Sequence, residues 1–350
     1  MLKSIKSLSL FIISCLVPAG AVHAQELTPI RIGWQTSWAT QGQVSMVLKN
    51  TNILELNGLK GELKGFTYGG PLNEGALAGA LDVIFTADQP ACILLARGAK
   101  WKIVGRLMYS RVGTIVPPDS PIRTVADLKG KTIGIPFGAA AQRETLRALK
   151  EAGVDAADVK ALNIGIYEQV NVILKGDNLA WPGVDAFSTW DPPLAELTLK
   201  NKARVLDLGL VTSAIVMSEE FIKKNPRAAA AFLKSYITAF YYYAGHQAEA
   251  NAWFKEEAKL DFDPAVLDLA ASVEPNLKAT SLAGVNISLS DKDISKIQSA
   301  ADFIYAQKLS ASQLKNVRKH INTDLLKKAV KELAAAPGTD YLTRIKPLSK

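Results

Sequence analysis

The stretch of small residues at 137–141 (Phe-Gly-Ala-Ala-Ala) is the part of the sequence best suited to bind a ligand through its backbone. It follows a predicted buried strand at residues 132–136 and precedes a predicted helix that begins at about Gln142 and ends at Gly153. The first N–H groups of a helix have no partner within it, and the helix dipole favours negative charge there, so this loop could hold an anion. The alternative is an ordinary βα unit that binds nothing.

Catalytic and metal-binding motifs do not occur in the sequence. The histidines His23, His246 and His320 lack metal-ligand spacing, and there is no HExxH, CxxC or GxSxG motif. Residues 130–132 (Gly-Lys-Thr) look like the end of a phosphate-binding P-loop, but that motif needs glycine where Val125 stands. We therefore predict no catalytic residue, no metal site, no cofactor and no enzymatic activity.

Residues 1–24 have the pattern of a secretory signal peptide. Two lysines form a charged n-region, residues 8–16 form an apolar run too short to span a bilayer, and Val-His-Ala at 22–24 is an A-x-A-like cleavage site. Cys15 follows an apolar pair and a serine, as in a lipoprotein box, so lipidation of Cys15 is an alternative. The pattern predicts an exported protein located in the periplasm.

Charge and cysteine content narrow the possible partners. The formal net charge is +8, which becomes +6 when the two lysines of the predicted signal peptide are removed. Basic residues are scattered apart from Lys327-Lys328, so the sequence predicts no nucleic-acid binding. Cys92 is the one cysteine that remains after cleavage, so no intramolecular disulfide can form, and its apolar surroundings predict a buried small side chain.

The order of predicted elements indicates two α/β units. Strands alternate with helices twice, on either side of the punctuation Pro-Pro-Asp-Ser-Pro at 117–121, which predicts parallel sheets. The predicted strands are 30–34, 63–68, 82–86 and 101–108, an apolar run at 112–116, then 132–136, 159–162, 184–189 and 204–210, with an apolar stretch at 211–217. Beyond Asn225-Pro226 the pattern is mainly helical, and Ser290 with Asp293 predicts a capping box.

Several short motifs occur together in one order. They are Ile30–Gln35, Gly69-Gly70-Pro71 with Leu72, Gly75, Gly79 and Asp82, Pro118–Ile122 followed by Val125–Lys131, Val184–Ala186, and Trp190–Pro192. In these motifs the chain resembles the periplasmic substrate-binding proteins of ABC transporters for nitrate, taurine and aliphatic sulfonates. The resemblance covers residues 30–230 and extends more loosely to about residue 310. One departure is the insertion 177–182 after Gly176, which could reshape the rim of a cleft or bulge at the surface.

The resemblance implies the fold and the domains. The expected fold is α/β, the two-lobed periplasmic binding protein fold (type II), in which each lobe is a mostly parallel sheet flanked by helices and two crossover strands form the hinge. Lobe one is expected to comprise residues 25–112 and 211–350, including the helical C-terminal part, and lobe two residues 113–210. Ligands of such α/β sheets bind just past the carboxyl ends of the strands, here in the cleft between the lobes.

This rule selects the candidate ligand-binding residues. Gly138 to Gln142 would donate N–H groups to an anion, other polar side chains would donate from lobe one, and aromatic rings would line an apolar part. The candidates are Trp34, Gln35, Ser37, Trp38, Gly69, Gly70, Thr86, Asp88, Phe137, Gly138, Ala139, Ala140, Gln142, Trp190, Asp191 and Thr212. Four aromatic candidates suit an aromatic acid or an organosulfonate better than nitrate, which has no apolar part to pack.

The resemblance also implies the function. We expect an exported, monomeric receptor that captures a small organic anion, either a sulfonate such as an alkanesulfonate or taurine, or an aromatic acid. It would deliver this ligand to the permease and ATPase subunits of an ABC importer. Three alternatives remain: a pyrimidine-precursor binder, an enzyme of the thiamine-pyrimidine synthesis type on the same fold, and a periplasmic sensory partner that presents its ligand to a receptor kinase.

Overall fold

The computed structural model describes residues 26–335 and 338–348. The predicted signal peptide and Cys15 therefore lie outside the described residues. Within these residues, no helix combines the length and the apolar character that crossing a membrane requires.

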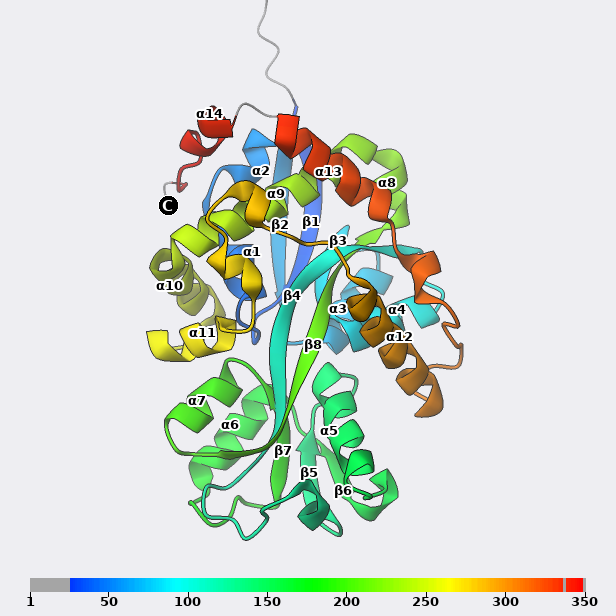
Figure 1. Ribbon diagram of the computed structural model, residues 1–350, viewed down its shortest axis with the longest axis vertical. Coiled ribbons are helices and arrows are strands. Elements are labelled where there is room, and N and C mark those ends of the chain that lie inside the picture. The colour runs from blue at the N-terminus through cyan, green and yellow to red at the C-terminus, as the bar shows by residue number, and fades with distance from the viewer. Residues whose placement is uncertain (1–25, 336–337, 349–350) are drawn as a thin grey trace, which may run out of the picture.

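Eight strands form one continuous hydrogen-bonded sheet in the order β2-β1-β3-β8-β4-β7-β5-β6. The strands are β1 (Thr28–Gln35), β2 (Leu59–Phe66), β3 (Val83–Ala87), β4 (Trp101–Val116), β5 (Thr132–Ile135), β6 (Lys160–Asn163), β7 (Ala186–Trp190) and β8 (Arg204–Ser218). Figure 1 shows two lobes, with β1, β2 and β3 in one and β5, β6 and β7 in the other. This arrangement confirms the predicted two-lobed α/β fold.

Helices cover both faces of the sheet in each lobe. Lobe two carries α5 (Ala140–Glu151) on one face and α6 (Ile166–Lys175) and α7 (Pro193–Leu199) on the other (Figure 1). The helices of lobe one that precede β4 are α1 (Gln41–Asn50), α2 (Ile53–Leu56), α3 (Gly69–Leu77) and α4 (Asp88–Ala96). Those that follow β8 are α8 (Glu219–Lys224), α9 (Pro226–Gly245), α10 (Gln247–Ala258), α11 (Pro264–Ala271), α12 (Asp291–Ala306), α13 (Thr323–Ala335) and α14 (Gly338–Thr343).

The crossover strands β4 and β8 each run through both lobes (Figure 1). In lobe one, Ser213–Met217 of β8 pairs with β3, and in lobe two, Val112–Ile115 of β4 pairs with β7. The sequence pattern predicted two segments separated at residues 109–111, but β4 is one continuous strand. Its pairing with β8 shifts register between residues 103 and 109, and the strand continues through these irregularities. The predicted strand 204–210 and the apolar stretch 211–217 are likewise one strand.

The pairing directions confirm a mostly parallel sheet in each lobe. β1 pairs in parallel with β2 and β3, and β5 pairs in parallel with β6 and β7. The exceptions are the crossover strands, because β8 is antiparallel to β3 and β4 is antiparallel to β7. Each lobe therefore has the same plan, three parallel strands followed by an inserted antiparallel strand. The predicted boundaries at residues 112/113 and 210/211 fall inside β4 and β8, and they stay a prediction.

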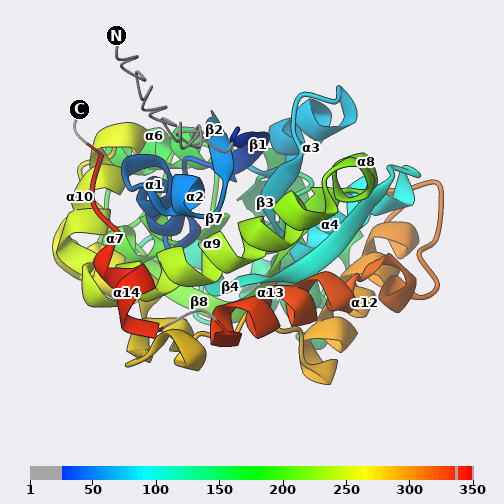
Figure 2. The same cartoon turned by 90° about the horizontal axis from the view of Figure 1, so that it is seen from above.

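The C-terminal helices pack onto lobe one. Figure 2 shows α9 and α13 lying side by side, and Phe232, Tyr236 and Phe240 of α9 are fully buried against Phe85 of β3 and its neighbours. Asn225 and Pro226 begin α9 as predicted, and the Ser290 and Asp293 capping box begins α12. These contacts make lobe one the larger unit and leave lobe two as a compact α/β layer.

Candidate anion-binding site between the lobes

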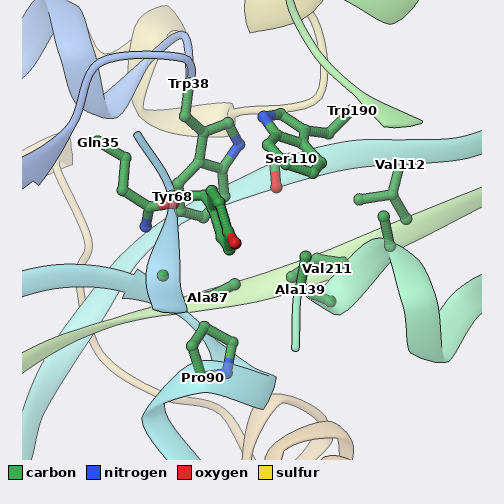
Figure 3. Close-up of a pocket in the computed structure, with 13 residues that line it drawn as sticks. Gln35, Trp38, Tyr68, Ala87, Pro90, Ser110, Val112, Ala139, Trp190 and Val211 are labelled. Atoms are coloured by element: carbon green, nitrogen blue, oxygen red, sulfur yellow. The ribbon is translucent and has the colours of Figure 1, made fainter. Parts of the chain in front are cut away.

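A cavity lies between the lobes (Figure 3). Strands of both lobes end at this cavity, and helices of both lobes begin there. Its lining comes from lobe one, lobe two and both crossover strands: Gln35, Trp38, Tyr68, Gly69, Ala87, Pro90, Ser110, Val112, Ala139, Ala140, Ala141, Trp190 and Val211. None of these thirteen residues is charged. The volume open to the centres of water-sized molecules is about 30 Å³, which is room for a few waters.

Two helices, one from each lobe, begin at this cavity with free N–H groups. Gly69 is the first residue of α3, and Ala140 and Ala141 are the first residues of α5. The N–H groups of Gly69, Gly70, Ala140 and Ala141 have no hydrogen-bond partner among the described residues, as expected for the first turn of a helix. Both helix dipoles therefore place their positive ends at one small space, which favours an anion.

The loop before α5 is more self-contained than its sequence indicates. The Gly138 N–H donates to Gln142 Oε1 at 2.9 Å, and the Phe137 N–H donates to Asn163 Oδ1 at 3.0 Å. The Ala139 N–H donates to the carbonyl of Pro136. The Gln142 N–H likewise donates to the carbonyl of Ala139, so among the donors predicted at Gly138 to Gln142, the N–H groups of Ala140 and Ala141 are the ones without a partner in this structure.

Two polar side chains of the lining are buried and have no partner. They are the indole Nε1 of Trp38, after β1, and the Oγ of Ser110, in β4. An unpaired buried donor costs free energy unless a ligand or a water satisfies it. Figure 3 shows the Trp38 and Trp190 rings close to Ser110. Neutral donors therefore accompany the two helix N-termini at this site.

Aromatic rings from both lobes make up much of the apolar wall. Trp38 and Tyr68 come from loops of lobe one, and Trp190 ends β7 in lobe two. The Trp190 Nε1–H donates across the cleft to the carbonyl of Ser37 at 3.2 Å. A second bond between the lobes joins Thr36 Oγ1 and Tyr167 OH at 3.1 Å. The lobes are therefore in direct contact around the cavity.

A buried ion pair also joins the lobes next to the cavity. Arg143 Nη1, on the first turns of α5, lies 2.9 Å from Asp88 Oδ1, at the start of α4. Arg143 Nη2 contacts Glu144 Oε1 at 2.8 Å. Burial raises the pKa of Asp88, and the charge of Arg143 opposes this rise. Burial lowers the pKa of Arg143, but the charges of Asp88 and Glu144 outweigh that effect, so its pKa is raised and it stays charged.

Three lobe-one candidates lie outside the lining of the cavity. Trp34 is 1% exposed and packs edge-on against Phe254 in the core. The Ser37 hydroxyl donates to the carbonyl of Thr67. Thr86 lies in β3 with its Oγ1 buried and unpaired, beside the cavity but outside its lining. Trp34 and Ser37 therefore make contacts within lobe one, whereas the buried hydroxyl of Thr86 has no partner in the described part of the chain.

Three other candidates are also held by partners or lie outside. Phe137 is 41% exposed, so its ring lies outside the cavity. Asp191 Oδ2 accepts from Arg111 Nε at 2.7 Å, and burial raises its pKa while this hydrogen bond lowers it. Thr212 Oγ1 donates to Asp293 Oδ1 in the C-terminal part of lobe one. These contacts account for the three side chains without a ligand.

The cavity thus brings together part of the predicted set. Six candidates line it: Gln35, Trp38, Gly69, Ala139, Ala140 and Trp190. Ten do not: Trp34, Ser37, Gly70, Thr86, Asp88, Phe137, Gly138, Gln142, Asp191 and Thr212. Contact of any of these residues with a ligand stays a prediction.

Sequence reasoning missed the residues in the middle of the crossover strands and one helix position. Ser110 and Val112 of β4, Val211 of β8, and Pro90 of α4 all line the cavity. A strand that connects two lobes must cross the cleft between them, so its central residues form the cleft floor. Recognising residues 101–116 as one strand would have identified Ser110 and Val112.

The insertion at residues 177–182 lies away from the cavity. The ring of Trp181 is buried and stacks on Phe187 with centroids 5.3 Å apart, and Asp177 Oδ1 accepts the N–H groups of Leu179 and Ala180. The segment precedes β7, whose opposite end, Trp190, reaches the cavity. The insertion therefore packs on lobe two and does not form the cavity wall.

The described residues offer little for metal or thiol chemistry. No group of three or more His, Cys, Asp or Glu side chains in residues 26–335 and 338–348 is placed to hold a metal ion. Cys92 is fully buried on α4, its Sγ donates to the carbonyl of Ile297, and burial raises its pKa. A thiolate at this position is therefore unfavourable.

Comparison with known proteins identifies relatives that are named as sulfonate-binding proteins. The chain is 28% identical over 228 residues to the "Putative aliphatic sulfonates-binding protein" of Escherichia coli (strain K12), covering 62% of this chain and 67% of that protein. It is 25% identical over 315 residues to the protein of the same name from Bacillus subtilis (strain 168), covering 88% and 86%. These relatives confirm the resemblance that the sequence motifs indicated.

Solved structures show how widely the fold is used. The alkanesulfonate-binding protein SsuA from Xanthomonas axonopodis pv. citri, bound to MOPS, superposes with a TM-score of 0.69 at 24% identity, covering 86% of this chain and all of that one. The desulfurization enzyme DSZB superposes with a TM-score of 0.62 at 13% identity, covering 87% and 99%. Binding proteins and an enzyme thus share this fold. A family model described as "NMT1/THI5 like" matches residues 72–250, just over half of the sequence, and on this match the chain belongs to the NMT1/THI5 like family.

Proposed function

We propose that this protein is an exported solute receptor that captures a small organic anion, with a sulfonate as the preferred head group, between its two lobes. The observation that carries the proposal is the cavity at which α3 and α5 begin, with the unpaired donors Trp38 Nε1 and Ser110 Oγ in its wall. Helix N-termini and neutral donors suit a tetrahedral oxyanion. The relatives named as aliphatic sulfonate-binding proteins support the same ligand class.

The apolar wall selects ligands with an apolar body. Trp38, Tyr68 and Trp190 offer ring surfaces next to the donors. Nitrate would leave these rings without a contact, whereas an alkanesulfonate or an aromatic sulfonate would bury its carbon atoms against them. An anion with both parts therefore uses the whole cavity.

Binding would proceed with movement of the lobes about β4 and β8. A cavity of about 30 Å³ for the centres of water-sized molecules is closed to an organic anion, so the cleft must widen to admit one. A ligand that contacts α3 of lobe one and α5 of lobe two then favours the arrangement in which the lobes meet. The two crossover strands are the covalent links that permit this motion.

A thermal-shift panel tests the ligand class. Alkanesulfonates, taurine, aromatic sulfonates, aromatic carboxylates, nitrate and neutral pyrimidines are compared on the mature chain. A sulfonate that binds only the folded state should stabilise it by about 3 kcal/mol at a hundredfold excess over its Kd. Stabilisation by a pyrimidine and by none of the anions would replace this proposal with the pyrimidine-precursor binder.

A pair of serine variants tests the location of the site. Ser110→Ala removes an unpaired hydroxyl that lines the cavity, and Ser213→Ala removes an unpaired hydroxyl of β8 that does not. We expect Ser110→Ala to weaken sulfonate binding about tenfold, the loss of one hydrogen bond to a charged group, and Ser213→Ala to leave it near wild type. If the two variants bind the sulfonate with equal affinity, the ligand does not contact Ser110, and the proposed location of the site is wrong.

Delivery to an ABC importer is the physiological role that we propose. Another relative carries the name putative ABC transporter periplasmic binding protein, which supports export to the periplasm and a membrane permease with its ATPase as partners. Cell fractionation should find the cleaved chain outside the cytoplasm. Uptake of a radiolabelled sulfonate should be lost on deletion of the gene, and an unchanged uptake with an altered transcriptional response would indicate the sensory partner instead.

A further inference from the structure

A neutralised arginine lies directly behind the wall of the cavity. Arg143 follows the lining residues Ala140 and Ala141 on α5. Asp88 lies between the lining residues Ala87 and Pro90 at the start of α4. The side chains of Arg143 and Asp88 are 8% and 0% exposed, and their charges meet at 2.9 Å. Arg143 is therefore paired with a carboxylate that comes from the opposite lobe.

The electrostatics that remain match a single negative charge. Each helix N-terminus is equivalent to roughly half a positive charge, so α3 and α5 together supply about one. The third helix that begins here, α4, carries Asp88 in its first turn, which offsets its own dipole. Trp38 Nε1 and Ser110 Oγ are neutral donors. The cavity thus has donors for several oxygens but no net ionic charge.

Building on the proposed function, we infer that Asp88 is a specificity-determining residue that makes the site selective for singly charged oxyanions. By neutralising Arg143, it removes the field that would favour a doubly charged head group. Sulfonates and phosphonates have similar tetrahedral heads, but a phosphonate carries a second charge once it loses its second proton. A second charge buried without a counter-ion is strongly disfavoured.

The position of the pair makes this effect specific to the closed state. Asp88 belongs to lobe one and Arg143 to lobe two, so the two side chains meet only when the lobes meet. Glu144, on α5 itself, stays with Arg143 in either state, and it also contacts Arg147 at 2.9 Å. Removing Asp88 therefore leaves Arg143 with a shared carboxylate and exposes the ligand to part of its positive charge.

Matched ligands test the selectivity by isothermal titration calorimetry. Butanesulfonate and butylphosphonate are titrated into the wild-type protein on either side of the second ionisation of the phosphonate, at about pH 5.5 and about pH 9. We expect the phosphonate to bind at the lower pH and to lose at least about tenfold in affinity at the higher pH relative to the sulfonate. Other titratable and charged groups near the pair are Glu144, Arg147, Cys92 and Asp207, and the sulfonate, whose charge is fixed, corrects for them.

Variants test the role of Asp88. Asp88→Asn should reduce the discrimination against the doubly charged phosphonate on the order of tenfold, and the ratio of the two affinities cancels any change in lobe closure. Arg143→Gln removes the charge that opposes the rise in the pKa of Asp88, so Asp88 adds its negative charge beside the ligand where it is ionised, and the discrimination should increase at the higher pH. The double variant is neutral again and should return to the wild-type ratio. Asp207→Asn, which removes a carboxylate that contacts Arg147 further along α5, is the matched control and should not change the ratio.

The outcomes separate this inference from the proposed function. Absence of binding by the sulfonate and the phosphonate at both pH values would overturn the proposed function. Equal binding of the two ligands by the wild type at the higher pH would overturn the selectivity alone. A wild type that discriminates, with Asp88→Asn and Arg143→Gln both at the wild-type ratio, would overturn the role of Asp88. The Arg143→Gln arm decides the matter if Asp88→Asn does not fold.

Discussion

The two lobes follow one topology but contribute to the cavity in different ways. In both, three parallel strands end at the cleft and an antiparallel crossover strand is inserted beside the third. Lobe one presents the large side chains of Trp38 and Tyr68, whereas lobe two presents one large side chain, Trp190, and the alanines 139–141 at the start of α5. The shared topology places a helix N-terminus on each side of the cavity, and aromatic side chains from both lobes shape the space between them.

The outer edges of the crossover strands differ as well. In lobe one, β4 is covered by the C-terminal part of the chain, since the Arg106 N–H donates to Ile287 O and Asn322 N–H donates to Ile103 O. In lobe two, β8 is the last strand, and Leu208 and Leu210 are 51% and 39% exposed. The C-terminal part of the chain therefore covers the outer edge of the crossover strands in lobe one, whereas Leu208 and Leu210 stay exposed in lobe two.

The largest effect is expected from a charge placed on the lobe-two side of the cavity. Ala140→Asp adds a carboxylate at the first position of α5. The carboxylate would accept hydrogen bonds from the free N–H groups of the first turn and would repel an anionic ligand. Sulfonate affinity, measured by calorimetry, should fall about a hundredfold or more. An acidic residue in the first turn of a helix is favourable, but Ala140 is buried, so the free energy of unfolding of the variant is measured together with its affinity.

Ala157→Asp is the control for that charge. Ala157 is exposed in the turn before β6, so this variant carries the same added charge away from the cavity. Its affinity and its melting temperature without ligand should match the wild type. Retained affinity in Ala140→Asp would show that α5 does not contact the anion.

A smaller effect should distinguish the two tryptophans that face each other across the cleft. Trp38→Phe removes a buried N–H that has no partner, whereas Trp190→Phe removes one that donates to Ser37 O. If the ligand accepts from Trp38, its loss should weaken sulfonate binding about tenfold, the value of a hydrogen bond to a charged group. Trp190→Phe should weaken binding less, because it acts through closure of the lobes alone. If Trp190→Phe weakens sulfonate binding more than Trp38→Phe does, the anion lies on the lobe-two side of the cavity.

The topology of the lobes could be predicted from the sequence, and the reason is periodicity. Apolar runs such as 132–136 and 184–189 are short, buried and separated by helical spacing, so they identify strands and their order. The ends of the strands then predicted Gln35, Trp38, Gly69 and Trp190 as residues at the cleft, and these line the cavity.

The remainder of the site depends on contacts that no local pattern contains. Asp88 and Asp191 stand at strand ends like ligand-binding residues, but their partners Arg143 and Arg111 lie 55 and 80 residues away in the sequence. Pairing across such separations is decided by tertiary packing, so sequence spacing could not show that both carboxylates are neutralised. Ser110 was missed for a similar reason, since its importance comes from the lobes on either side of β4.

The smallest effect on binding is expected at the hinge, where the C-terminal part of lobe one contacts both crossover strands. Asp293 Oδ1 accepts from Tyr109 OH of β4 at 2.9 Å and from Thr212 Oγ1 of β8 at 3.2 Å, and its Oδ2 accepts from Ser290. Burial raises the pKa of Asp293, but these hydrogen bonds outweigh burial and lower it. A lowered pKa stabilises the folded protein above the pKa of an unfolded carboxyl, and this contribution is lost as the pH falls through the folded value.

Asp293→Asn should therefore reduce the free energy of unfolding by about 1 kcal/mol near pH 7, and the difference from wild type should shrink as the solution is acidified through the carboxyl range. Urea unfolding at a series of pH values measures it. Asp291→Asn is the matched control in the same first turn of α12, since Asp291 pairs with the exposed Arg318, and an exposed pair contributes little. Sulfonate affinity should change little in either variant, because neither residue lines the cavity. If Asp293→Asn loses more binding free energy than folding free energy, the hydrogen bonds from Tyr109 and Thr212 to Asp293 also determine the position of lobe two in the closed state.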